Sequence, residues 1–218
     1  MRILKSVMVL FIMATIGCGS AQKSFDPEYV KVTNERAQKI VDDLGITEGA
    51  KKLAVRDIIA GQYRSLSAIQ DVRDQQIDAL DNTDMTELKK DEVIAKIETK
   101  AQNQVGKLHK KYINALQSQL NEKQVVQVKD GMTYGVVPLT YNGYQEMLPE
   151  LTTGQKEVIY DYLVEAREKA MDAGSSDKKH WWFGKYKGKI NNYLSAEGYD
   201  LNQASKDWQA RIKAEKNK

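Results

Sequence analysis

The 218-residue chain contains a single cysteine, Cys18, which lies close to its N-terminus. The rest of the chain therefore has no disulfide, no thiolate metal site and no cysteine nucleophile, and it must be stabilised by packing. Proline occurs three times and glycine 14 times. This scarcity of turn-forming residues favours long helices over many short strands. The sequence also lacks a phosphate-binding loop, a nucleophile elbow and a zinc signature, so it offers no motif for the enzyme classes that depend on them.

Residues 1–21 resemble a secretion signal. Arg2 and Lys5 form a charged start, and residues 7–16 form an apolar run that is too short for a permanent membrane span. The formal net charge of +3 falls to +1 once Arg2 and Lys5 are removed with the signal. Export and this low charge argue against nucleic acid as a partner.

The signal can be processed in two ways. Ile16-Gly17-Cys18 resembles a bacterial lipobox, although Thr15 stands where a large aliphatic residue is usual, and this route lipidates Cys18. Alternatively, the small residues 19–21 permit ordinary cleavage before Gln22. Both routes predict an exported protein in the periplasm or at the cell envelope, whose membrane contact is limited to a lipid anchor.

Apolar residues recur with helical spacing over most of the chain. Asp26 and Pro27 are typical of a helix cap and a first helical position, and the helix that they start is expected to end before Gly45. Thr47 is expected to cap a second helix, and a third follows the DNTDMT segment at 81–86. These two helices are long enough to form an antiparallel pair. Further helices are predicted from Thr152, from about residue 176, and from about residue 201 to residue 212.

Residues 131–151 interrupt this pattern. Their glycines, two prolines and β-branched residues predict an irregular loop with a short hairpin around residues 136–141. The sequence as a whole predicts an all-α bundle with one domain over residues 25–212. The lysine-rich tail at 213–218 is expected to fray.

The densest aromatic cluster is HWWFGKYKGKINNYL, residues 180–194. On a helix, one stripe has the spacing of a buried face: Trp182, Tyr186, Ile190 and Leu194. The neighbouring face joins an indole to amine and amide donors, and His180 borders it: Trp181, Lys185, Lys189 and Asn192. Gly184 and Gly188 remove side chains beside this face, so a ligand can approach the backbone. Such a surface suits a sugar, whose C–H face packs on the ring while donors bind hydroxyls or a uronate carboxylate.

The predicted loop carries a second group of aromatic and amide side chains: Tyr134, Tyr141, Asn142 and Tyr144. Loops on rigid scaffolds often carry function. We expect this loop to form the other wall of a groove that begins at Trp181. The predicted ligand is a glycan, neutral or acidic. No cofactor is expected, and the sequence predicts no particular oligomeric state.

Two other functions remain open. An apolar residue precedes a capping box at Asn121–Gln124 and at Thr152–Gln155, and this local pattern is similar to the LTxxQ motif of helical periplasmic chaperones. A protein-interaction module of that kind would need an exposed, concave apolar face. The other alternative is a glycan hydrolase or lyase that uses His180 with a carboxylate such as Glu165.

The remaining histidine and the acidic residues give weaker signals. His109 stands among lysines and is expected to be exposed. A row of four carboxylates follows one face of the second helix: Asp71, Asp74, Asp78 and Asp81. Because a helix lacks the wrapping loop of calcium sites, we interpret this row as a solvated surface and expect no metal.

Two stretches resemble the family called domain of unknown function 3826, which occurs in gut-type Bacteroidota. They are VKDGMTYGVVPLTYNGYQEMLPELT (128–152) and EAREKAMDAGSSDKKHWWFGKYKGKINNYLSAEGYDL (165–201). The resemblance implies an exported helical domain associated with polysaccharide utilisation and described at most as a sugar binder. It carries over no catalytic residue. Carbohydrate binding is therefore the leading functional expectation.

Overall fold

The computed structural model describes residues 25–216, and the predicted signal with Cys18 lies outside them. Every regular element over these residues is a helix, which confirms the predicted all-α fold. The elements are α1 (Pro27–Asp42), α2 (Gly49–Asp78), the short 3₁₀ helix η1 (Ala79–Asn82), α3 (Glu87–Gln117), α4 (Glu122–Met132), α5 (Val136–Met147), α6 (Thr153–Ala170), α7 (Ser176–Ala196) and α8 (Leu201–Lys216). None of these helices is long and apolar enough to cross a membrane.

Side-chain caps fix where several helices begin. The Asp26 carboxylate accepts hydrogen bonds from two backbone N–H groups of the first turn of α1, and Pro27 occupies the first helical position, as predicted. Asn121 and Thr152 start α4 and α6 through capping boxes. Ser175 caps α7 by accepting a bond from the Lys178 amide. In contrast, α2 begins at Gly49 with no side-chain cap, so the expectation that Thr47 caps it is wrong.

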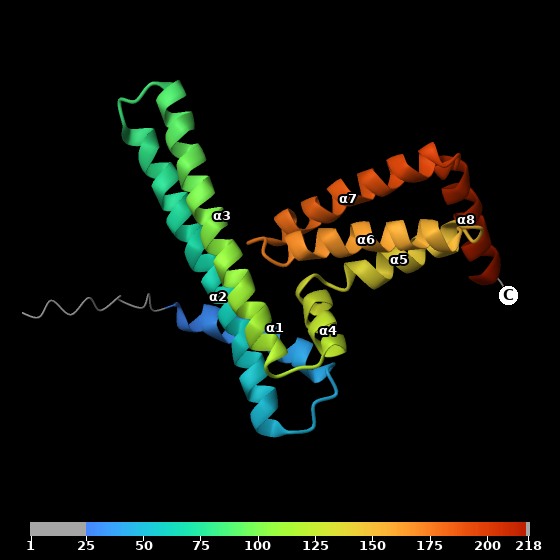
Figure 1. Ribbon diagram of the computed structural model, residues 1–218, viewed down its shortest axis with the longest axis horizontal. Coiled ribbons are helices and arrows are strands. Elements are labelled where there is room, and N and C mark those ends of the chain that lie inside the picture. Colours follow the sequence, from blue (N-terminus) through green and yellow to red (C-terminus); the bar gives the residue numbers. More distant parts are fainter. Residues whose placement is uncertain (1–24, 217–218) are drawn as a thin grey trace, which may run out of the picture.

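The predicted long antiparallel pair is present. Helices α2 and α3 form a hairpin whose distal end projects away from the other helices, and α6 and α7 form a second hairpin (Figure 1). The two hairpins diverge from the region where α1 and α4 pack, and α8 lies across the far end of the second hairpin (Figure 1).

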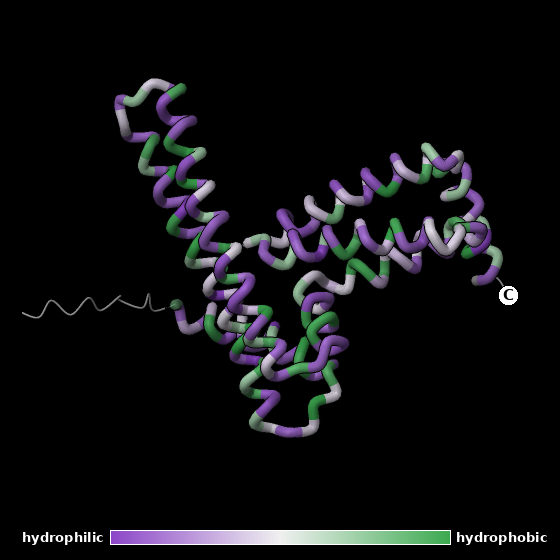
Figure 2. The backbone as a smooth tube through the Cα atoms, viewed as in Figure 1, coloured by the Kyte–Doolittle hydropathy of each residue, from purple (hydrophilic) through white to green (hydrophobic). Residues whose placement is uncertain are grey.

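Buried apolar side chains form two separate cores. Along the helices, hydrophobic residues alternate with hydrophilic ones (Figure 2). The first core joins α1, α2, α3 and α4, and Val41, Ile59 and Leu116 are fully buried in it. The second core joins α5, α6 and α7 with the start of α8, and Leu163 and Ile190 lie at its centre. Both cores are built from residues that recur every three or four positions along their helices.

Charged side chains connect the two cores across α4 and α6. Arg167 Nη1 lies 2.7 Å from Asp130 Oδ1, and Lys129 Nζ lies 2.8 Å from Glu168 Oε2. The Arg167 side chain is almost fully buried. Met171, directly after α6, packs into the first core. We call the four charged residues Lys129, Asp130, Arg167 and Glu168 the polar seam.

Residues 131–151 are largely helical, so the predicted loop and hairpin are wrong. Pro138 lies in the first turn of α5, where backbone N–H groups have no partner within the helix, and proline therefore costs no hydrogen bond. Gly135 adopts a φ of 65° at the cap and permits the sharp turn from α4 into α5. Val137, Tyr144 and Leu148 are buried at helical spacing. In the sequence, the glycines and prolines of residues 131–151 obscure this helical spacing.

The C-terminal helix is longer than expected. α8 ends at Lys216, so the tail that was expected to fray from residue 213 is helical over residues 213–216. Lysine, alanine and glutamate, which make up this stretch, are good helix formers, and this explains the extension.

Candidate functional site

A groove of about 720 Å³ separates the α2–α3 hairpin from the α6–α7 turn and the first residues of α7. We call it the Trp181 groove. One wall comes from α2 and α3 and includes Gln70, Arg73, Glu98, Gln102, His109 and Lys110. The other comes from α6, α7 and their turn and includes Glu168, Asp172, Gly174, Lys178, Trp181 and Trp182. Most of these side chains are polar, and the two indoles add apolar surface together with Ile69, Ala101 and Val105.

Trp181 presents its ring to solvent at the groove, with 58% of its surface exposed. Trp182 is half-buried and meets Trp181 edge-on, with ring centroids 4.9 Å apart and planes at 77°. Lys185 Nζ lies 5.1 Å from the Trp181 ring centroid and 5.4 Å from that of Trp182, within cation–π range. The indole therefore contacts Trp182 and Lys185 yet stays accessible. Trp182, expected only in the core, also lines the groove.

A histidine–carboxylate pair lies in the same groove. His109 Nδ1 is 2.8 Å from Asp172 Oδ2, and Nε2 is 4.0 Å from Glu168 Oε2. The close contact with the Asp172 carboxylate raises the pKa of His109 above its ordinary value, against the lowering effect of burial. The expectation that His109 is exposed is wrong, because its side chain is only 25% exposed. Its place three residues before buried Tyr112 was the sequence signal for this position.

The predicted site residues of α7 do not lie together. His180 stacks on Tyr134, with ring centroids 5.8 Å apart. Lys189 Nζ lies 4.2 Å from the Tyr186 ring centroid, so this lysine covers a core tyrosine and does not line the groove. Asn192 is exposed elsewhere on α7. Of the face predicted from the sequence, Trp181 lines the groove and Lys185 contacts its ring.

The tyrosine segment does not form the other wall of the groove. Tyr141 packs edge-on against Tyr160 at the second core, with centroids 5.3 Å apart. Tyr144 is buried and donates a hydrogen bond of 2.7 Å to Asn191, and burial raises the pKa of Tyr144 to about 12. Asn142 lines a different pocket, of about 710 Å³, between α5, α7 and α8. The segment folds as α5 and packs on α6, and none of its side chains lines the Trp181 groove.

The predicted catalytic pair has other partners. Glu165 interacts with the Tyr186 hydroxyl, whereas His180 stacks on Tyr134. Neither His180 nor Glu165 lines the Trp181 groove. The histidine and carboxylates that the structure brings together in the groove are His109, Asp172 and Glu168.

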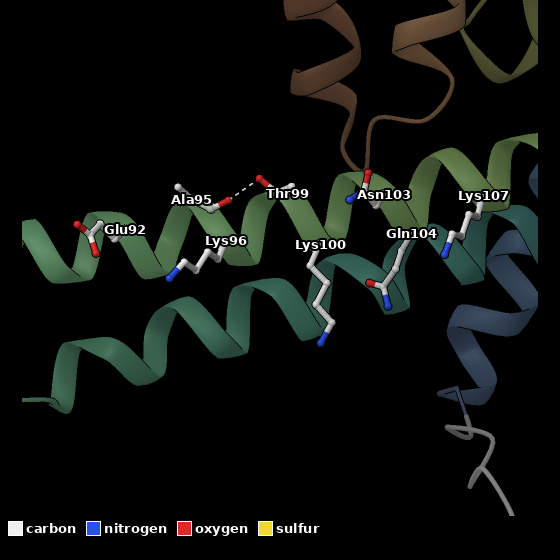
Figure 3. A pocket seen from close by; sticks show the side chains of 8 residues that line it. All are labelled: Glu92, Ala95, Lys96, Thr99, Lys100, Asn103, Gln104 and Lys107. Carbon is white, nitrogen blue, oxygen red and sulfur yellow. Dashed lines mark hydrogen bonds between the residues drawn. The ribbon is translucent and has the colours of Figure 1, made fainter.

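A further depression, of about 790 Å³, follows the outer surface of α3 (Figure 3). All eight of its side chains belong to α3, so it has no second wall, and Thr99 bonds only to the Ala95 carbonyl of its own helix (Figure 3). Its lining includes the charged residues Glu92, Lys96 and Lys100. This surface does not supply the concave apolar face that a chaperone-like module requires.

Over residues 25–216, no group of three or more histidine, cysteine, aspartate or glutamate side chains is arranged to hold a metal ion. The carboxylates of the acidic row are divided between two elements, since Asp81 belongs to η1. Asp74 pairs with the neighbouring Arg73.

The family model described as Protein of unknown function (DUF3826) matches residues 30–214. The chain belongs to this family. The DUF3826 match includes every residue that lines the Trp181 groove, so the groove is part of the family's domain. No curated protein matches the chain.

Proposed function

We propose that this protein is an exported carbohydrate-binding protein and that the Trp181 groove holds the glycan. The observation that carries the proposal is the exposed indole of Trp181 at the edge of a polar groove. A large aromatic ring that stays 58% exposed beside such a groove is well placed for a ligand with both an apolar face and hydroxyl groups.

The lining of the groove matches this chemistry. The side-chain amides of Gln70 and Gln102 both donate and accept hydrogen bonds, as sugar hydroxyls do. Lys110 and Lys178 offer ammonium donors for a uronate carboxylate, while Glu98 supplies an acceptor. Acidic and basic groups nearly balance over the whole lining, which suits a neutral or weakly acidic glycan.

The location that we propose is the periplasm or the cell envelope. The signal-like residues 1–21 support it, with either lipidation at Cys18 or cleavage before Gln22. The resemblance to a Bacteroidota family associated with polysaccharide utilisation supports the same setting. A protein of this kind would hold or present glycan segments outside the cytoplasm.

Affinity gel electrophoresis with neutral and acidic polysaccharides tests the proposal. We expect at least one polysaccharide to retard the wild-type protein, and Trp181→Ala to abolish most of that retardation. Tyr160→Ala is the matched control, because Tyr160 is also an exposed aromatic but lies outside the groove. A wild-type protein that migrates unchanged in every polysaccharide contradicts the proposal.

The His109–Asp172 pair supports a second candidate, a glycan hydrolase or lyase that uses the same groove. An imidazole oriented by a carboxylate can act as a general acid or base. Release of new reducing ends from a retarding polysaccharide, lost in His109→Gln, would establish this activity. Retardation without any bond cleavage would leave binding as the function.

A further inference from the structure

A second pocket, of about 400 Å³, lies beside the Trp181 groove and shares only Ala173 and Gly174 with its lining. Its walls come from α1, α2, the α4–α5 turn and the start of α7. Three cationic side chains line it: Arg36, Lys39 and Lys179. No aspartate or glutamate is among its lining residues. We call it the basic pocket.

Lys179 is the central group of this pocket. Its side chain is only 6% exposed, although lysine is almost never buried without a partner. Its Nζ donates one hydrogen bond, of 2.7 Å, to the Met132 carbonyl and lies 5.4 Å from the Tyr63 ring centroid. Within residues 25–216 no carboxylate lies within ion-pairing distance of it. Burial, together with Arg36, lowers the pKa of Lys179 to about 8, and the more distant Asp172 carboxylate offsets only part of this shift.

This arrangement is costly without a counter-ion. Burying an ammonium group away from water is unfavourable unless an opposite charge or hydrogen bonds compensate it. The Met132 carbonyl and the faces of Tyr63 and Tyr134 compensate only part of the charge. Arg36 and Lys39 add two further positive charges to the same pocket. An anion would relieve the repulsion among all three cations.

Neutral donors complete the lining. Ser67, Ser176 and Tyr63, each of which carries a hydroxyl group, also line the pocket. Burial raises the pKa of Tyr63 to about 12, so its hydroxyl stays protonated and can donate. The planar guanidinium of Arg36 offers the two parallel N–H groups that tetrahedral oxyanions accept well.

We propose that the basic pocket binds a sulfate or phosphate group carried on a small organic molecule. The cations and hydroxyls bind the oxyanion. The volume of about 400 Å³ falls within the range of small-molecule sites, about 300–1,000 Å³, and leaves room for the organic part beside the exposed ring of Tyr134. This site is independent of glycan binding in the Trp181 groove.

Isothermal titration calorimetry tests the proposal with five probes: inorganic sulfate, inorganic phosphate, glucose 6-sulfate, glucose 6-phosphate and glucose. We expect saturable binding of at least one ester, tighter than that of its inorganic ion, and no binding of glucose. Arg36→Gln should weaken ester binding about tenfold, since it removes a charged hydrogen-bond donor. Lys179→Met should weaken it at least as much.

The controls keep the test decisive. Lys31→Gln removes an exposed charge from the same helix as Arg36, outside the pocket, and should leave binding unchanged. Arg36 is itself exposed, so its replacement reports on binding even if Lys179→Met does not fold. Absence of saturable ester binding to the wild-type protein overturns the proposal. The proposal is also overturned if Lys31→Gln weakens ester binding as much as Arg36→Gln does. It is overturned as well if the inorganic ions bind as tightly as the esters.

Discussion

The two cores of the molecule differ in the side chains that fill them. The first core is mainly aliphatic, with Val41, Val55, Ile59 and Leu116 fully buried and Tyr112 as its buried aromatic residue. The second core buries three aromatic residues and is bordered by further half-buried rings. The buried aromatic residues of this second core are Tyr144, Phe183 and Tyr186. Rings fill such a core because each removes a large apolar area from water.

This difference shows how the aromatic density of residues 180–194 should be interpreted. Most of its rings pack inside the second core, and Trp181 alone in that stretch is an exposed large apolar residue. Both candidate sites lie where the two cores meet, beside the polar seam and the α6–α7 turn. Polar and charged groups gather there because neither core extends across the junction.

The largest expected effect comes from opening a cavity in either core. Ile59→Ala and Leu163→Ala each remove part of a fully buried side chain and should lower the free energy of unfolding by about 2–5 kcal/mol. Guanidinium denaturation measures this loss. Circular dichroism reports on both cores, whereas fluorescence of the three tryptophans, at positions 181, 182 and 208, reports on α7 and α8.

The two probes also test whether the cores unfold together. Because the polar seam and Met171 join them, we expect Ile59→Ala to shift both transitions to the same lower midpoint. A fluorescence transition that stays at the wild-type midpoint while the dichroism transition moves would mean that the cores are independent.

Breaking the polar seam should have the next largest effect. Arg167→Met leaves Asp130 and Glu168 without their buried cation. Because both carboxylates are partly exposed, the loss should be smaller than the cost of about 3–5 kcal/mol for removing one partner from a fully buried pair. Lys169→Met, an exposed neighbour on α6, should change unfolding little. If both variants unfold at the wild-type denaturant concentration, the seam does not stabilise the fold.

The smallest effect is a pH dependence from His109. Its pKa is raised in the folded state by the contact with Asp172, with a further contribution from Glu168, while burial and Lys129 oppose the rise. Its stabilising contribution is therefore complete below the ordinary value of 6.5 and disappears as the pH rises through the folded pKa. Denaturation of wild type and His109→Gln between pH 5 and 9 should show a difference that shrinks with rising pH. A difference that grows with pH would contradict this account, because it would mean that folding lowers the pKa of His109.

The helices were predictable because their signals are local. Asp26 with Pro27, and the capping boxes at Asn121 and Thr152, fix helix starts within a few residues. The α5 helix was missed because Gly135 and Pro138 read as turn residues, although both are compatible with a helix start. The residues around Pro138 do not show by themselves that this proline lies in the first turn of a helix and not in a loop.

The site was only partly predictable. The position of Trp181 beside the apolar stripe of α7 correctly predicted an exposed ring. The α2–α3 wall of the groove was not foreseen, because it depends on how two hairpins separated by many residues pack. Lys179 was missed although it lies four residues before buried Phe183, on the stripe itself. A lysine on a buried stripe was the available sequence signal for the basic pocket.

The most direct test of the account is an NMR titration that follows the indole N–H resonances of the three tryptophans. The ¹⁵N-labelled protein is titrated with oligosaccharides from the polysaccharide that retards it most, and tryptophan-to-phenylalanine variants assign the signals. The account predicts that the signals of Trp181 and Trp182 shift to saturation, while that of Trp208, which lines the separate pocket at α5 and α8, does not. A saturable shift of Trp208 with no change at Trp181 would contradict it.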